Sequence, residues 1–310
     1  MRILILGAGG IGGYFGARLQ AGGSDVTFLV RPARAAALQA GGLKVNSPLG
    51  DVAVTPRLLT AVDSPFDLVL LSCKAYDLDS ALTAIAPAVG PHTVVLPLLN
   101  GVAHLDRLDA HFGRARVAGG VAHLALTLEA DGGIRHLNAT EKLIVGARDP
   151  AQQAVIAALG DRLAALSPDY TVSADIEQAM WDKLVFIATL AGATCLMRAT
   201  IGDILDSCAG PALIAGLLAE GASIATACGH PPTPARMEDY RATLTQPGST
   251  LTASMLRDLQ RDAPTEAEHI FGDLRARAAR HALATPWLDL AHAHLQAAEA
   301  RRRRVSESAG

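Results

Sequence analysis

Hydrophobic and polar positions follow two different patterns in the two halves of the chain. In the first half, apolar runs of five or six residues alternate with segments that have the spacing of amphipathic helices. The runs predict strands at residues 2–6, 25–30, 67–72 and 93–97. Strands that alternate with helices are typical of a parallel sheet with crossover helices. This half is therefore predicted to be a doubly wound α/β domain.

Two further segments of this half predict hairpins. Residues 43–54 contain the turn sequence Ser47-Pro48-Leu49-Gly50 between two short strand patterns. Residues 115–147 are richer in strand than in helix pattern and include Asp131-Gly132-Gly133, a hairpin signal.

After Ser173 the strand patterns give way to helical periodicity. A helix at about 151–166 and a strand at 170–173 precede this change. The helices predicted after it occupy about 175–197, 210–228, 233–245, 265–283 and 286–303. Thr285-Pro286 favours the start of the last helix, because a capping residue precedes a proline at the first helical position. We therefore predict an α/β domain at 1–172 and an all-helical domain at 173–310.

A glycine motif follows the first predicted strand. Gly7, Gly9, Gly10, Ile11 and Gly12 lie between Ile3-Leu4-Ile5-Leu6 and a helical segment, which is the setting of a dinucleotide-binding fingerprint. Gly7 permits a tight turn, Gly9 lets the backbone approach a pyrophosphate, and Gly12 lets the helix pack on its strand. The pyrophosphate is stabilised by N–H groups at the helix N-terminus. A chance glycine cluster is the alternative, but the strand–loop–helix context favours a Rossmann-type domain.

The second predicted strand ends in a base where NAD-binding domains have an acid. Arg31 follows Val30, and Arg34 comes three residues later. An acidic residue there would bind the ribose 2′-hydroxyl of NAD, whereas an arginine suits the 2′-phosphate of NADP. We therefore expect NADP (NADPH) as the cofactor.

Composition excludes several functional classes. The net charge of −3 argues against a general nucleic-acid surface, and the basic run Arg301–Arg304 suits the end of a helix by complementing its dipole. No apolar run reaches the length of a membrane span, and Met1 leads directly into a predicted core strand. The four cysteines lack metal-type spacing. We expect a cytoplasmic protein that has no membrane segment and no metal site, and whose cysteines are buried small apolar residues.

Lysine is rare, which draws attention to the lysines that remain. Only four of the 27 basic residues are lysine, and Lys74 and Lys183 are the two of interest. An ammonium can release its proton at accessible pH, and a guanidinium cannot. Lys74 and Asn100 each follow a predicted strand, where a substrate cleft between the two domains would lie. The structural alternatives are a solvated loop cation for Lys74 and a turn at Asn100-Gly101.

Lys183 lies on the apolar face of the helix that begins near Ile176. As a functional group it would be an ammonium whose pKa is brought towards neutrality by partial desolvation. The alternative is a lysine that extends to solvent from the helix edge or pairs with Asp182 or Glu177.

Ser254 and Glu266 are weaker candidates when judged by position alone. Thr265 and Glu268 predict a capping box, which would explain Glu268 structurally. Glu266 is not needed for that cap, although a first-turn acid also gains from the helix dipole. Ser254 could simply start a helix.

Together these residues resemble the ketopantoate reductase family, NADPH-dependent enzymes of pantothenate biosynthesis. The resemblance covers nearly the whole chain, and the motifs that carry it are Gly7-Ala8-Gly9-Gly10-Ile11-Gly12-Gly13, Ser72-Cys73-Lys74-Ala75, Asn100-Gly101, Trp181-Asp182-Lys183-Leu184, Ser254-Met255-Leu256-Arg257-Asp258 and Thr265-Glu266. It implies that NADPH reduces a 2-oxo acid and that Lys183 is the general acid. It also implies that Lys74 and Asn100 lie at the nicotinamide and substrate. Ser254 and Glu266 would contact the substrate, and Glu266 could instead orient Lys183.

The chain departs from the family at two positions of the lysine helix. The family usually has asparagines four and eight residues after the catalytic lysine, and this chain has Ile187 and Ala191. Thr194 returns to the same face but lies roughly 16 Å beyond Lys183, too far to replace both amides. The resemblance implies ketopantoate (2-dehydropantoate) as substrate, and this departure favours a less polar 2-oxo acid. A non-catalytic NADP-binding sensor is a third hypothesis for the function. For the oligomeric state, a homodimer formed through an apolar surface of the helical domain is a hypothesis.

Overall fold

The computed structural model describes residues 1–308, which form two compact units. The first unit comprises Met1–Asn100 and His104–Met180, and the second comprises Gly101–Ala103 and the chain from Trp181 onward. The division falls inside the long helix α6 (Ile176–Met197), whereas the boundary expected from the sequence lay between residues 172 and 173.

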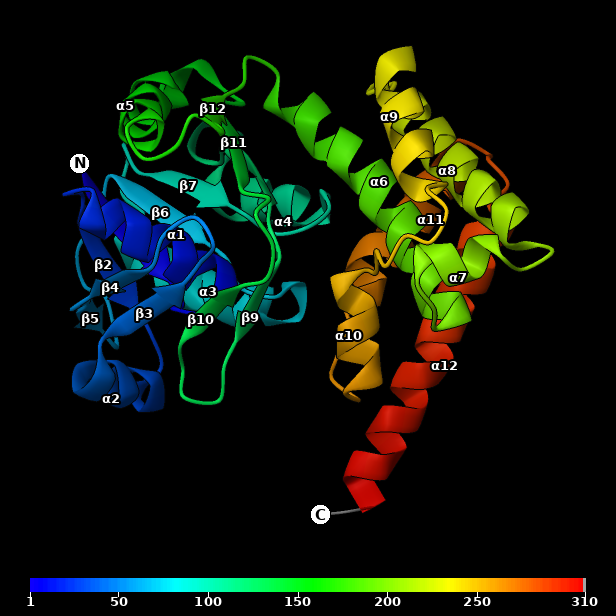
Figure 1. Ribbon diagram of the computed structural model, residues 1–310. Helices are drawn as coiled ribbons and strands as arrows, with labels where there is room; N and C mark the ends of the chain where they lie inside the picture. Colours follow the sequence, from blue (N-terminus) through cyan, green and yellow to red (C-terminus); the bar gives the residue numbers. More distant parts are fainter. Residues whose placement is uncertain (309–310) are drawn as a thin grey trace. The chain divides into compact units, whose positions relative to one another are not determined.

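A five-stranded parallel sheet forms the centre of the first unit (Figure 1). Its strands, in spatial order, are β5 (Arg57–Leu59), β2 (Asp25–Leu29), β1 (Arg2–Leu6), β6 (Leu68–Leu71) and β7 (Val94–Pro97). The four strands predicted from apolar runs are confirmed. The edge strand β5 was not predicted, because three half-exposed residues give too short a pattern.

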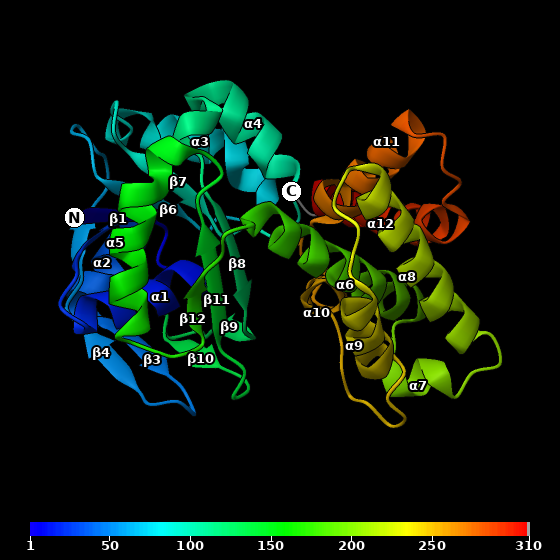
Figure 2. The same cartoon turned by 90° about the horizontal axis from the view of Figure 1, so that it is seen from above.

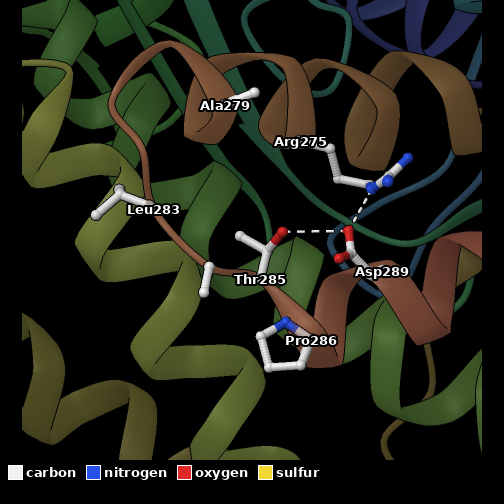
Figure 3. Close-up of a pocket in the computed structure, with 7 residues that line it drawn as sticks. Arg275, Ala279, Leu283, Thr285, Pro286 and Asp289 are labelled. Carbon is white, nitrogen blue, oxygen red and sulfur yellow. Dashed lines mark hydrogen bonds and ion pairs between the residues drawn. The ribbon is translucent and has the colours of Figure 1, made fainter.

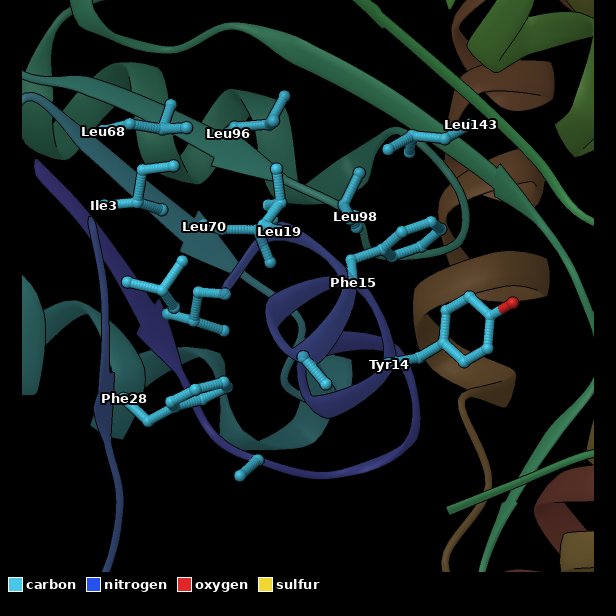
Figure 4. Packing of buried hydrophobic residues seen from close by; sticks show 14 of the residues in the cluster. Ile3, Tyr14, Phe15, Leu19, Phe28, Leu68, Leu70, Leu96, Leu98 and Leu143 are labelled. Atoms are coloured by element: carbon cyan, nitrogen blue, oxygen red, sulfur yellow. The ribbon is translucent and has the colours of Figure 1, made fainter. Parts of the chain in front are cut away.

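The helix after the glycine motif, α1 (Gly10–Ala21), packs on this sheet. Phe15 and Leu19 of α1 lie against apolar side chains of the strands, including Ile3 and Leu70 (Figure 4). Gly16 makes the contact close, because a Cβ there would lie 2.5 Å from the Phe28 ring. This packing fixes the start of α1 at the carboxyl end of β1.

Two smaller sheets complete the first unit. One has the strand order β4 (Val52–Val54), β3 (Leu43–Asn46), β10 (Ile134–His136), β9 (Leu126–Leu128), and the other has β12 (Tyr170–Val172), β11 (Lys142–Gly146), β8 (Gly119–His123). Both predicted hairpins are confirmed, since β3 pairs antiparallel with β4 and β9 with β10. The helices are α2 (Pro32–Gly41), α3 (Leu78–Ile85), α4 (Ala103–Phe112, whose first residue falls in the second unit) and α5 (Gln153–Ala164). Helix α1 contacts strands of both the first and the second sheet.

All regular secondary structure among the described residues of the second unit is helical (Figure 2). Its helices are the larger part of α6, then α7 (Ile201–Leu205), α8 (Gly210–Ala227), α9 (Pro234–Leu244), α10 (Ser254–Gln260), α11 (Asp273–Arg280) and α12 (Pro286–Ser308). The predicted fold class, a parallel α/β domain followed by a helical one, is confirmed. The short helix α7 was not predicted, whereas α10 confirms the alternative in which Ser254 starts a helix. The segment predicted as one helix at 265–283 begins at Ala267, passes through a π-helical turn, Glu268–Gly272, and continues as α11.

The expectation that the four cysteines are buried is confirmed for Cys195. Cys73 and Cys228 are half-buried, and Cys208 is exposed.

Two helices correct the expectation about apolar length. Both α6 and α8 are long and apolar enough to cross a membrane by length and composition alone. In the most apolar stretch of each, 67% of α6 and 50% of α8 is buried inside the protein. The expectation that no apolar segment reaches this length was wrong, because a helix that forms the core of a helical unit is apolar on most of its faces.

Candidate active site

Four predicted site segments share one edge of the parallel sheet. Arg31 follows β2, the glycine loop follows β1, Lys74 follows β6, and Asn100 follows β7. These strands are neighbours in the order β2, β1, β6, β7, and they pair in parallel register, Leu6 with Leu29 and Leu71 and Leu71 with Pro97. The carboxyl ends of parallel strands lie at the same edge, which is where such sheets bind ligands.

The glycine loop has the geometry that its sequence requires. Gly7 adopts a left-handed φ of +86°, and its N–H donates to the Leu29 carbonyl at 2.9 Å. A Cβ at Gly12 would lie 2.4 Å from Ser72 Oγ and 2.7 Å from the Gly7 carbonyl oxygen, so only glycine fits this helix–strand contact. A Cβ at Gly9 would meet nothing within 4 Å.

The N-terminus of α1 fits an anion such as a pyrophosphate. Gly9 is the N-cap and provides no side chain to the end of the helix, which continues through Gly10 and Ile11. The first turn also contains no acidic residue. The N–H groups and the positive end of the helix dipole therefore meet no competing carboxylate from this turn.

The two arginines after β2 have different surroundings. Arg31 precedes α2, and 83% of its side chain is exposed, with the guanidinium 3.7 Å from the Asp77 carboxylate. The Arg34 side chain is half-buried, and its Nη2 donates to the carbonyls of Ala8 at 2.8 Å and Gly132 at 2.9 Å. Arg31 therefore offers an accessible cation, while Arg34 is bonded to backbone beside the glycine loop.

Lys74 and Asn100 are half-buried, and each lies three residues after the end of its strand, β6 or β7. Lys74 precedes a short 3₁₀ turn, Ala75–Asp77, and its carbonyl accepts from the Asp77 N–H at 2.9 Å. Asn100 is followed by Gly101, which has a left-handed φ of +80°. A turn therefore exists at Asn100-Gly101, as the structural alternative predicted, and the Asn100 side chain is held just before it.

In the second unit, Lys183 and Glu266 form the candidate proton-transfer pair. Lys183 is half-buried on α6, and Glu266 is only 8% exposed just before the π-helical turn. Burial lowers the pKa of Lys183 to about 8, and the negative charge of Glu266 opposes this shift. Such a value brings an ammonium close to the working range of a general acid.

The carboxylates named as alternative partners of Lys183 have arginine partners. Glu177 accepts hydrogen bonds from Arg114 and Arg148, the latter at 3.0 Å. The Asp182 carboxylate lies 3.5 Å from Arg236. The structure therefore gives each of these two acids a guanidinium partner, while Glu266 provides the charge that acts on Lys183.

The predicted capping box at Thr265 is wrong. The helix begins only at Ala267, and the Glu268 carboxylate is engaged elsewhere. It accepts from Gln296 Nε2 at 2.8 Å and lies 3.1 Å from His292 Nε2. Tertiary contacts with α12 have replaced the local cap, and π-helical turns of this kind are often found at functional sites.

The remaining predicted residues lie along α6 and at the start of α10. Ile187 is half-buried and Ala191 is buried, one and two turns after Lys183. Thr194 is fully buried, donates to the Leu190 carbonyl at 2.7 Å and accepts from the Ala253 N–H at 3.4 Å. This bond holds the residue before Ser254 against α6. Ser254 itself is exposed and is the first residue of α10, not its cap.

A pocket of about 460 Å³ lies elsewhere in the second unit, where α11 leads into α12 (Figure 3). Arg275, Thr285 and Asp289 are among its lining residues, and Thr285 Oγ1 donates to the Asp289 carboxylate at 3.2 Å. No residue predicted for the site lines it. These contacts organise the start of α12, which Thr285-Pro286 had predicted.

Known proteins match the chain along almost its whole length. Residues 3–150 match the family model of ketopantoate reductase PanE/ApbA, and residues 175–299 match the model of its C-terminal part. The chain belongs to the ketopantoate reductase family. It is therefore an oxidoreductase.

Individual relatives agree with this assignment. An uncharacterized oxidoreductase of Bacillus subtilis, YkpB, is 36% identical over 301 residues, which cover 97% of this chain and 99% of that protein. The 2-dehydropantoate 2-reductase of Mesorhizobium japonicum is 28% identical and covers 86% of this chain and 88% of its own length.

Solved structures have the same fold. The 2-dehydropantoate 2-reductase of Geobacter metallireducens has a TM-score of 0.87 at 30% identity, covering 96% of this chain and 100% of its own. A D-mandelate dehydrogenase with NADH and anilino(oxo)acetate also has a TM-score of 0.87. Its identity is 22%, with 98% of this chain and 100% of that chain covered, so it supports the fold alone.

Proposed function

We propose that this member of the ketopantoate reductase family reduces a 2-oxo acid to the 2-hydroxy acid with NADPH. The observation that carries the proposal is Lys183, half-buried on α6, whose pKa is lowered by burial to about 8 with the charge of Glu266 acting on it. A lysine in this state can both stabilise an oxyanion and donate a proton, the two tasks that carbonyl reduction requires.

The first unit supplies residues for the cofactor. The N-terminus of α1 would hold the pyrophosphate, and Gly9 leaves room for its approach. The exposed guanidinium of Arg31 supports a choice of NADP, because it occupies the position where an acid would favour NAD. When bound, the cofactor supplies the hydride that reduces the carbonyl carbon.

The second unit supplies the proton. As the carbonyl carbon accepts a hydride, negative charge develops on the carbonyl oxygen. The Lys183 ammonium stabilises that charge and donates a proton from Nζ to the oxygen, and the product is the hydroxy acid. Glu266 favours the protonated lysine before the reaction. Acid catalysis of this kind accelerates a reaction by roughly 10²- to 10⁴-fold.

Two kinds of substrate fit this chemistry, and the apolar face of α6 bears on the choice between them. Ketopantoate is the substrate that family membership favours, and its reduction would place the enzyme in pantothenate biosynthesis. Ile187 and Ala191 favour a less hydroxylated 2-oxo acid, because an apolar wall leaves a substrate hydroxyl without a hydrogen-bond partner. Phe186, also half-buried on α6 with its ring centroid 5.4 Å from that of Tyr240, adds to this apolar character.

NADPH oxidation by the purified protein, measured on ketopantoate and on a series of branched and aromatic 2-oxo acids, tests the proposal. Selective turnover of ketopantoate would establish the family substrate, and faster turnover of an apolar acid would establish the alternative. Binding of NADPH without turnover of any 2-oxo acid would contradict a reductase and favour a sensor.

The variant Ile187→Asn sharpens the test of specificity. An amide one turn after Lys183 offers a hydroxyl both a donor and an acceptor. We expect the ratio of kcat/KM for ketopantoate to that for an apolar 2-oxo acid to rise at least about tenfold. Ile187→Leu keeps the volume and polarity of the side chain and serves as the control. An equal change in both variants would show that this position does not select the substrate.

A further inference from the structure

Arg34 lies where three segments distant in the sequence meet. It belongs to the first turn of α2, and one of its nitrogens, Nη2, donates to both the Ala8 carbonyl at 2.8 Å and the Gly132 carbonyl at 2.9 Å. Ala8 lies between Gly7 and Gly9 of the glycine loop, and Gly132 is in the turn between β9 and β10. One guanidinium therefore joins the loop that would bind a pyrophosphate to a hairpin more than a hundred residues away.

The β9–β10 hairpin is built to hold that guanidinium. Gly132 has a left-handed φ of +84°, and its N–H donates to the Glu129 carbonyl at 2.9 Å, which closes the turn. A Cβ at Gly132 would lie 2.4 Å from Arg34 Nη1. The hairpin also packs on α1, since Ile134 Cδ1 occupies the space that a side chain at Gly13 would need. Backbone conformation and packing thus both place the Gly132 carbonyl against Arg34.

The contacts of Arg34 differ from those of a phosphate ligand. Its side chain is half-buried, its Nε is buried without a hydrogen-bond partner, and its Nη2 is engaged by two carbonyls. Arg31, by contrast, is 83% exposed. A guanidinium that binds the 2′-phosphate needs accessible donors. The exposed Arg31 guanidinium, 3.7 Å from the Asp77 carboxylate, meets this requirement better than Arg34 does.

We infer that Arg34 is a positioning residue for the pyrophosphate loop and not a ligand of the 2′-phosphate. By holding the Ala8 carbonyl away from the N-terminus of α1, Arg34 keeps the neighbouring N–H groups directed towards the pyrophosphate. Its positive charge behind the loop also favours an anion in front of it. Both effects act on a part of the cofactor that NADPH and NADH share. This inference rests on the proposed binding of a dinucleotide.

Three ligands separate the two roles when their dissociation constants are measured by calorimetry. NADPH has both pyrophosphate and 2′-phosphate, NADH has only the pyrophosphate, and adenosine 2′-monophosphate has only the 2′-phosphate. We expect Arg34→Ala to raise the dissociation constants of NADPH and NADH by the same factor, about tenfold, because the variant loses charge-assisted hydrogen bonds. Binding of adenosine 2′-monophosphate should be unchanged. Arg31→Ala should weaken NADPH and adenosine 2′-monophosphate and leave NADH unchanged.

Gly132→Ala provides a second variant that leaves Arg34 in place. Its new Cβ would displace the guanidinium, so the variant should reproduce the ligand pattern of Arg34→Ala. Gly23→Ala is the matched control, because Gly23 has the same φ of +84° but no atom within 4 Å of a Cβ. The control carries the same backbone strain and should leave all three dissociation constants unchanged.

Two results would overturn the inference. A loss of NADPH affinity in Arg34→Ala at least tenfold greater than the loss of NADH affinity would make Arg34 a ligand of the 2′-phosphate. Unchanged affinity for both dinucleotides in Arg34→Ala and Gly132→Ala would reduce the contact to a structural one. If the unaltered protein binds neither dinucleotide, the proposed function itself fails, and this result is distinct from either of the others.

Discussion

The candidate site is formed mainly by backbone groups in the first unit and by side chains in the second. In the first unit the central feature is backbone: the glycine loop, the N-terminus of α1 and two carbonyls held by Arg34. In the second unit it is a side-chain pair, the half-buried Lys183 and the buried Glu266. A backbone site can be lost by adding a single methyl group. A site made from a partly buried charge lowers the free energy of unfolding, because its chemistry requires the charge to be withdrawn from water.

Replacing Lys183 should have the largest effect on activity and should leave cofactor binding nearly unchanged. In Lys183→Met the apolar volume is kept and the proton donor is lost, so we expect kcat for 2-oxo acid reduction to fall by roughly 10²- to 10⁴-fold. The dissociation constant for NADPH should remain within about twofold. Steady-state kinetics and calorimetry on the same preparation measure both.

The same variant should be more stable than the natural protein at neutral pH. A pKa lowered from 10.5 to about 8 means that the folded protein holds the lysine proton more weakly than the unfolded chain does. Protonated Lys183 therefore reduces the free energy of unfolding below pH 8, and this loss disappears as the pH rises towards 10.5. We expect Lys183→Met to gain about 1–3 kcal/mol at pH 7 by denaturant unfolding. Lys142→Met, an exposed lysine on β11, is the control and should change neither stability nor kcat.

Two glycine variants test the backbone side of the comparison. Gly12→Ala places a Cβ against Ser72 and the Gly7 carbonyl, so it should destabilise the protein by about 1–3 kcal/mol. Gly9→Ala places a Cβ in open space at a φ of −88°, which alanine adopts easily. It should leave the melting temperature unchanged but weaken NADPH binding about tenfold or more, because the methyl group occupies the approach of the pyrophosphate. Equal losses of stability in the two variants would contradict the separate roles assigned to these glycines.

The sequence predicted those features whose cause is local. The glycine motif and the apolar runs sufficed for the parallel sheet, and Asp131-Gly132-Gly133 sufficed for the β9–β10 hairpin. The position of Lys183 on an apolar helix face indicated its burial. In each case the residues that determine the structure lie within a few positions of one another.

The features that were missed or wrong depend on contacts between distant segments. Glu268 does not form the predicted capping box because its carboxylate contacts Gln296 and His292 of α12 instead. The contact of Arg34 with the Gly132 carbonyl was missed because that carbonyl lies 98 positions further along the chain. The sequence held no signal for this contact, because no local rule connects an arginine with a hairpin glycine so far along the chain.

The pH dependence of kcat/KM for 2-oxo acid reduction at saturating NADPH tests the account most directly, because it reports the pKa of the proton donor. Reduction needs the protonated Lys183, so kcat/KM should be constant below pH 8 and fall about tenfold per unit above it. Oxidation of the hydroxy acid needs the neutral lysine and should rise through the same pH. A reduction rate that stays level up to pH 10 would contradict the assignment of Lys183 as the proton donor.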